Sequence, residues 1–100
     1  MTSYKEYNVI VLNEAEEELR SIYRYFAQDL YSPETAEIQR RMLENALLSL
    51  KRFPLRHRRY IGEYRRLNVG SYAVLYTVEN DIVLICGIFH QSMNIRKQLL

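Results

Sequence analysis

The 100-residue sequence has one cysteine, Cys86, and no apolar run near the roughly 18 residues that a membrane span requires. A single cysteine excludes an intrachain disulfide and a metal cluster built from thiolates. The N-terminal MTSYKE stretch lacks the apolar segment of a secretory signal. With three glycines and two prolines, the chain shows no linker, repeat or low-complexity tract. These absences predict one cytoplasmic domain over residues 1–100, with no membrane partner.

Charge is unevenly distributed along the chain, although the total is only +2. Residues 1–50 carry 5 Lys/Arg and 9 Asp/Glu, a net −4, whereas residues 51–100 carry 9 and 3, a net +6. Seven of these cations lie within residues 51–66, where Glu63 is the one acid. Because such close like charges repel one another, this block predicts an acidic partner or a phosphate backbone as its complement. The alternative interpretation is a solvated loop that keeps the protein soluble.

The first half of the chain predicts one strand followed by two helices. Residues 7–12 form a short stretch that contains several β-branched side chains, which favours a strand. Asn13, with Glu16 three residues later, indicates a helix start of the capping-box type. The Ser32–Pro33 pair indicates the start of a second helix, which Pro54 stops. Two helices with one apolar stripe each and a short link should form an antiparallel hairpin.

The second half predicts three strands, over residues 63–69, 72–78 and 82–89. Tight turns are expected between them, at residues 70–71 and 79–81. The last strand is apolar on both alternating faces, which favours a central place in the sheet. The order β-α-α-β-β-β predicts an α+β fold, in which the N-terminal helical hairpin packs on one side of an antiparallel sheet.

Five segments of the chain carry a resemblance to a known family. They are the first helix, the exit of the second, the following hairpin, the rest of its second strand and the end of the last strand: Ala15–Leu19 with the pair Ile22–Tyr23, Leu50–Pro54, Arg65–Tyr72, Val74–Val78 and Ile88–Asn94. In this order and spacing they resemble the RelE/ParE superfamily of type II toxin–antitoxin toxins, over nearly the whole chain. The resemblance implies the same β-α-α-β-β-β fold. RelE-like members cut mRNA on the ribosome, whereas ParE-like members poison DNA gyrase.

One position separates these two branches. Family nucleases commonly carry an arginine directly after the aromatic residue of the second hairpin strand, where this chain has Ala73. Losing one such cation typically costs about two powers of ten or more in rate. Arg65 or Arg66 could replace it from the neighbouring strand, so a RelE-like ribosome-dependent endoribonuclease stays the alternative, and an inactive member is a third. His90 lies where several family nucleases have a catalytic histidine, but Gln91 follows it in place of an aromatic acid–base residue.

The ParE-like interpretation implies no catalytic residue, no cofactor and no metal. It implies DNA gyrase as the target and a cognate ParD-like antitoxin as the neutralising partner, with operator DNA bound only through the antitoxin. The antitoxin is expected to have a disordered tail that folds on the toxin, as an acidic, amphipathic helix on the basic side of the sheet. The implied target contacts are His90, Gln91, Ser92, Met93, Asn94, Arg96 and Lys97. The predicted basic surface comprises Arg58, Arg59, Arg65 and Arg66.

Some of these residues also have a purely structural interpretation. His90 either fixes the strand exit as a buried, hydrogen-bonded side chain or touches a target. Tyr72 and Tyr76 share one face of a strand and are expected in the core. Arg65 and Arg66 should point to opposite faces of their strand, so at most one of them can join any single site.

Overall fold

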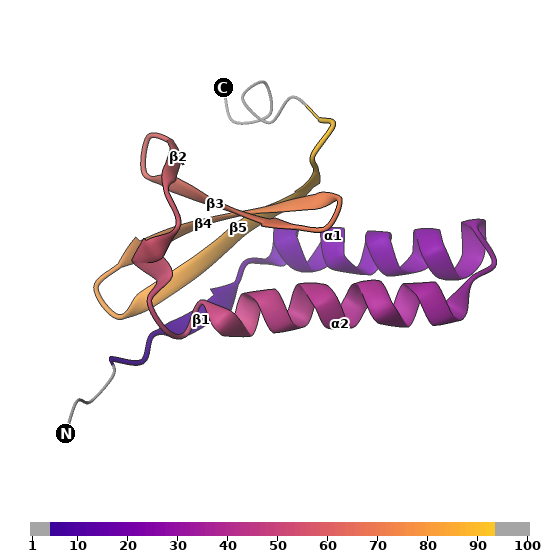
Figure 1. Cartoon of the computed structure of the whole chain (residues 1–100), viewed down its shortest axis with the longest axis horizontal. Helices are drawn as coiled ribbons and strands as arrows, with labels where there is room; N and C mark the ends of the chain where they lie inside the picture. The colour runs from indigo at the N-terminus through magenta and orange to yellow at the C-terminus, as the bar shows by residue number, and fades with distance from the viewer. Residues whose placement is uncertain (1–4, 94–100) are drawn as a thin grey trace.

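The computed structural model describes residues 5–93, which form a five-stranded sheet with a helical hairpin on one face (Figure 1). The elements in chain order are β1 (Asn8–Val11), α1 (Asn13–Arg24), the π-helical turn η1 (Tyr25–Asp29), α2 (Pro33–Ser49), the 3-10 turn η2 (Pro54–Arg56), β2 (Arg59–Ile61), β3 (Tyr64–Val69), β4 (Tyr72–Glu79) and β5 (Ile82–His90). The strands lie in the order β1-β5-β4-β3-β2. The predicted α+β class and the helical hairpin packed on a sheet are confirmed.

The sheet is mixed, which corrects the expectation of a wholly antiparallel one. β1 runs parallel to β5, with Asn8 opposite Ile82 and Val11 opposite Ile85. The other neighbouring strands are antiparallel. The tight turn after β4 makes β5 antiparallel to β4. β1 pairs in parallel with the other edge of β5, and α1 follows β1 directly in the chain. β5 therefore lies between β1 and β4, as the apolar character of both its faces predicted.

A short strand, β2, lies inside the cationic block and was not predicted. Arg59 is opposite Arg65, and Ile61 is opposite Tyr64. Gly62 turns the chain between the two strands with φ +53°, a conformation that glycine adopts without strain. Because β2 has only three residues, its sequence shows no alternation that could have announced it.

The helix starts differ in part from the sequence signals. The carbonyl of Leu12 accepts the Glu16 N–H (3.0 Å), so Leu12 precedes α1 and Asn13 already lies within the helix. No side chain caps this end, and the predicted capping box is therefore wrong. α2 begins directly after Ser32, as predicted, although the Ser32 hydroxyl donates to Thr35 Oγ1 (2.7 Å) and accepts no hydrogen bond from a backbone N–H of the first turn.

The main core fills the space between the hairpin and the sheet. Leu43, in α2, and Leu50, directly after α2, point into this core. Tyr76 of β4 and Ile85 of β5 meet them from the sheet. Tyr72 is buried in the same cluster, which confirms that both tyrosines face the helices. The opposite side of the sheet, called the open face below, carries a second, smaller cluster in which Tyr60, Tyr64 and Phe89 pack against Ala73 and Leu75.

Candidate functional site

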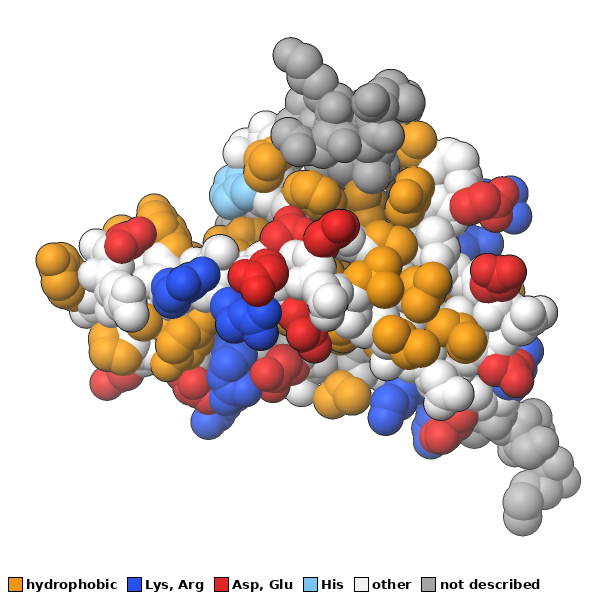
Figure 2. All heavy atoms as spheres, turned by 180° about the vertical axis from the view of Figure 1, so that it is seen from behind, with side chains coloured by type: hydrophobic (Ala, Val, Ile, Leu, Met, Phe, Trp, Pro, Cys, Tyr) orange, Lys and Arg blue, Asp and Glu red, His pale blue; other side chains and the backbone are white. Residues whose placement is uncertain are grey.

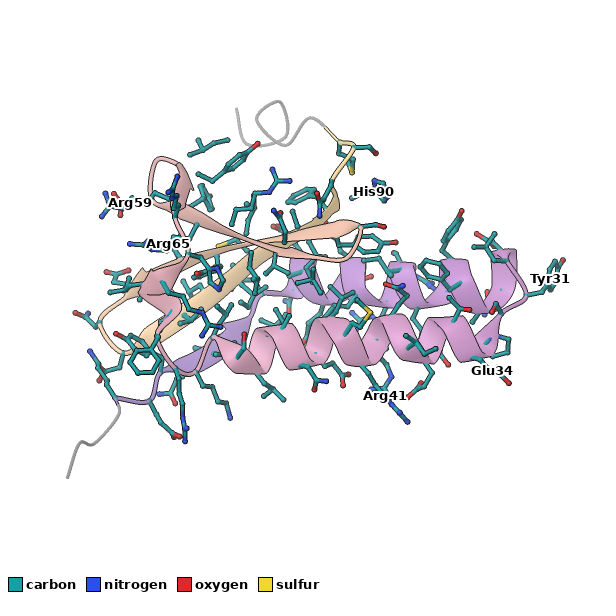
Figure 3. All side chains as sticks on the ribbon, in the orientation of Figure 1. Tyr31, Glu34, Arg41, Arg59, Arg65 and His90 are labelled. Carbon is teal, nitrogen blue, oxygen red and sulfur yellow. The ribbon has the colours of Figure 1, made fainter. Side chains whose placement is uncertain are left out.

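The predicted site residues fall into two groups at opposite ends of the sheet. Figure 3 shows Arg59 and Arg65 at the β2–β3 end and His90 at the far end of β5. In the strand register, His90 is opposite Tyr72, and Tyr72 is opposite Val69. Because Arg65 precedes Val69 by four positions, the two groups are separated by roughly 13 Å along the strands. The basic surface and the end of β5 therefore do not converge on one small site.

The segment after β5 is held by its own hydrogen bonds. His90 Nδ1 accepts the Ser92 backbone N–H (3.1 Å) and lies 2.7 Å from the Ser92 hydroxyl. The His90 ring also packs edge-on against Tyr72, with centroids 5.5 Å apart. Gln91 Nε2 donates to the Gly70 carbonyl (2.7 Å), which ties this segment to the β3–β4 turn. His90 is hydrogen-bonded at the strand exit but exposed, so the expectation of a buried histidine is wrong.

The remaining predicted target contacts divide between described and undescribed residues. Met93 turns back on the strand end, where its N–H donates to the His90 carbonyl (3.0 Å). Its side chain is part-exposed and lines a hollow on the open face. Asn94, Arg96 and Lys97 lie outside the described residues, and their contact with a target stays a prediction.

Arg65 and Arg66 lie on opposite faces of β3, as predicted. Arg65 Nη1 donates to the carbonyls of His57 (2.6 Å) and Leu55 (3.3 Å). The Arg66 guanidinium lies over the ring of Tyr60 on the open face, 4.9 Å from its centroid. Arg65 therefore anchors the loop before β2, whereas Arg66 belongs to the surface of the open face.

The rest of the predicted basic surface is exposed and electrostatically uncompensated. Arg58 and Arg59 are both exposed, and Arg59 is directly opposite Arg65 in the register. Like charges opposite one another on neighbouring strands destabilise a sheet. No carboxylate of residues 5–93 lies within salt-bridge distance of Arg58, Arg59, Arg65 or Arg66. An acidic partner would relieve this repulsion.

The position that separates the two branches is part of an apolar floor. Ala73 is fully buried and clusters with Leu75 on the open face. Tyr60, Tyr64 and Phe89 pack against this pair. Asn68 is directly opposite Ala73 and accepts a hydrogen bond from Arg66 Nε (2.8 Å), so position 73 itself contributes no charge to this floor.

A hollow of about 510 Å³ opens beside this floor and was missed by the sequence analysis. Its lining combines an apolar base with two carboxylates of α1: Leu12, Glu14, Glu18, Tyr64, Leu75, Cys86, Gly87, Phe89 and Met93. The four-residue spacing of Glu14 and Glu18 puts both on one side of α1, which was the available signal. Figure 2 shows acidic side chains over the helices next to a patch of hydrophobic ones near the β1 edge, where Ile10 and Ile82 are part-exposed. The hollow therefore has an acidic border, in contrast to the basic β2–β3 end.

Glu18 occupies a special place at the edge of β5. β1 pairs with β5 only as far as Ile85, and beyond that point the Glu18 carboxylate lies close enough to the Ile88 backbone for that group to affect its pKa. Burial raises the pKa of Glu18 above its ordinary 4.5, and the nearby Glu14 charge adds to this shift, while the Ile88 backbone opposes it. The folded protein therefore favours the protonated form of Glu18 more than the unfolded chain does.

This pKa shift predicts a pH-dependent effect of Glu18→Gln. A raised carboxyl pKa contributes stability that is fully present below the unfolded pKa and is lost as the pH rises through the folded pKa. Glu18→Gln should therefore raise the melting temperature near neutral pH, and its advantage should shrink below the ordinary carboxyl pKa of 4.5. Thermal melts across this range test it, with Glu17→Gln, an exposed acid of the same helix, as the control. An equal gain at all pH values would contradict the assignment.

Two negative findings concern only the part of the chain that the structure describes. No helix within residues 5–93 has both the length and the apolar character needed to cross a membrane. In the same range, no three His, Cys, Asp or Glu side chains gather closely enough to hold a metal ion.

Comparison with known proteins gives one family and two similar folds. A family model described as "ParE toxin of type II toxin-antitoxin system, parDE" matches residues 9–95. A chain from the solved structure "Chromosomal ParDE TA system from P. aeruginosa" is similar in fold, with a TM-score of 0.76 at 15% identity, over 86% of this chain and 97% of that one. A chain of the toxin-antitoxin complex RelBE2 from Mycobacterium tuberculosis gives a TM-score of 0.61 at 21% identity, over 93% of this chain and 100% of that one. No curated protein sequence matches the chain.

Proposed function

The chain belongs to the ParE toxin family of type II toxin–antitoxin systems, and on that premise we propose that it inhibits DNA gyrase and so blocks replication. A toxin of this class has an antitoxin as its partner. In our proposal the antitoxin is ParD-like, and operator DNA is bound only through it. The toxin itself acts by binding a protein and is not an enzyme.

The uncharged, buried side chain at position 73 carries this proposal. Cleavage of RNA by its own 2′-hydroxyl needs a base, an acid and a cation at the scissile phosphate. Ala73 is buried and supplies no charge. Arg66 is on the open face, whereas His90 packs on Tyr72 toward the helix-covered face. Arg66 and His90 thus lie on opposite sides of the sheet. Arg65, on the side of His90, is bonded to the carbonyls of Leu55 and His57 at the other end of the sheet. This arrangement supports a toxin without nuclease chemistry.

The second candidate function is ribosome-dependent cleavage of mRNA, and one observation favours it. Tyr60, Tyr64 and Arg66 gather on the open face, and aromatic rings with a guanidinium can stack on unpaired bases. Such a platform would bind RNA but would still lack a cation at position 73. A nuclease of this kind would need Arg66 for its activity.

Expression in bacterial cells tests the proposed function. Gyrase trapped on cleaved DNA leaves broken chromosomes, so a reporter of the DNA-damage response should be induced before protein synthesis falls. Co-expression of the cognate antitoxin should abolish the induction. An immediate arrest of translation with codon-phased mRNA cuts and a silent reporter would instead support the nuclease.

A further inference from the structure

A second hollow, of about 360 Å³, lies where the exit of α2 meets the lead-in to β1. We call it the basic-rimmed hollow, and it is lined by Lys5, Tyr7, Phe53, Pro54, Leu55 and Arg56. Its base is apolar, and the two side chains on either side of the buried Pro54 are strongly exposed: Phe53 at 56% and Leu55 at 54%. Two large, exposed apolar side chains at the border of one hollow form a surface that a partner can cover.

The base of this hollow is held rigidly by the sheet. The Tyr76 hydroxyl donates to the Pro54 carbonyl from inside the core (2.5 Å), and Arg65 donates to the Leu55 carbonyl. From the other side, the Tyr7 N–H donates to the Lys51 carbonyl (2.9 Å). A hollow that is already formed lowers the ordering cost that a partner must overcome on binding.

The backbone at Phe53 is strained. Phe53 adopts φ +53° and ψ +48°, in the left-handed region that a bulky residue seldom occupies. Such a conformation costs about 1–3 kcal/mol and is found most often at binding and switch segments. Here it coincides with an exposed aromatic ring at the border of a hollow.

The rim of this hollow is positively charged. Arg56 lines the hollow and is exposed, and no carboxylate of residues 5–93 lies within salt-bridge distance of it. Lys5 is partly balanced by Asp81 (3.0 Å). An occupant should therefore combine an apolar side chain with carboxylates beside it.

We propose that the basic-rimmed hollow binds an acidic segment of the antitoxin, which inserts one apolar side chain between Phe53 and Leu55. Its carboxylates would face Lys5 and Arg56. A hollow of this size receives one side chain of a linear segment, which suits an extended antitoxin tail better than a broad protein surface. The inference rests on the proposed function only in that the chain has an antitoxin.

The substitution Leu55→Glu tests this site, with the purified cognate antitoxin as the probe. A carboxylate at the border of the hollow would repel the acidic segment and obstruct the apolar insertion, so the affinity should fall by about 30-fold or more, as for a central interface residue. Ile38→Glu is the matched control, because Ile38 is equally exposed (57%) but lies on α2, away from the hollow. Its affinity for the antitoxin should stay within about 3-fold of wild type.

A second variant, Phe53→Ala, keeps the proposal testable if Leu55→Glu fails to fold. It should also weaken antitoxin binding, and thermal melts identify any variant that is unfolded. Arg56→Gln should make the affinity less sensitive to salt than that of the wild type, because one charge contact is removed.

Several results would overturn the proposal. Wild-type affinity of Leu55→Glu or of folded Phe53→Ala would do so, as would an equal loss in Ile38→Glu. Loss of gyrase inhibition with normal antitoxin binding would assign the hollow to the target, and a change of oligomeric state alone would assign it to a second copy of the chain. The affinity measurement involves no gyrase, so a toxin that leaves gyrase untouched refutes the proposed function and not this site.

Discussion

Leu43→Ala is expected to lower the free energy of unfolding by about 2–5 kcal/mol, the range measured when a buried leucine is truncated in a packed core. Leu43 is 1% exposed and belongs to the cluster that joins α2 to the sheet. The substitution removes Cγ and both Cδ methyl groups, so apolar contacts are lost and a cavity remains that the surrounding side chains fill only in part. Urea denaturation of the purified toxin measures the change.

The matched control for this change lies on the same helix. Leu48 is 55% exposed, so Leu48→Ala should change the free energy of unfolding by less than about 0.5 kcal/mol. Equal effects at the two positions would mean that the hairpin does not pack through the Leu43 side of α2.

Tyr76→Phe is expected to cost roughly 1–3 kcal/mol, because it leaves the buried Pro54 carbonyl without its hydrogen-bond donor. Burial raises the pKa of Tyr76 to about 12, so the hydroxyl remains a proton donor throughout the neutral range. The loss also removes one of the hydrogen bonds that hold the 3-10 turn η2 on the sheet, while the Arg65 bond to the Leu55 carbonyl remains. Chemical denaturation measures the stability, and hydrogen exchange at residues 55–57 measures the loosened turn.

Tyr72→Phe is the control for the same strand and the same face. Tyr72 is also buried, but within residues 5–93 its hydroxyl has no hydrogen bond to protein. Its removal should change the free energy of unfolding by less than about 0.5 kcal/mol. A Tyr76→Phe variant as stable as Tyr72→Phe would show that the Pro54 contact does not hold the turn.

The sequence predicted the helices and strands that are long enough to show their own periodic pattern of apolar side chains. The apolar stripes of the two helices and the alternation along β4, with Tyr72 and Tyr76 on the inner face, led to the correct fold class. The Asn13 capping box failed because the Leu12 carbonyl already completes the first turn. β2 was missed because a strand of three residues depends on its partner β3 and not on its own sequence.

Contacts between remote segments limited the prediction of the site. Parallel pairing of β1 with β5 joins the two halves of the chain, and no local motif announces it. The basic-rimmed hollow forms only when Tyr7 is brought against Phe53 and Leu55. The sequence did predict that Arg65 and Arg66 diverge, but the use of Arg65 as a loop anchor follows from carbonyls supplied by another segment.

Two parallel assays give the most direct test of a toxin that acts by binding a protein. One contains purified gyrase and supercoiled plasmid, and the other contains ribosomes bound to mRNA. The same toxin preparation is added to both reactions, with antitoxin-bound toxin as the control. We predict that plasmid accumulates in linear or relaxed form while the message stays whole, and that antitoxin prevents the effect. Cut message at the ribosome with gyrase fully active would contradict the account.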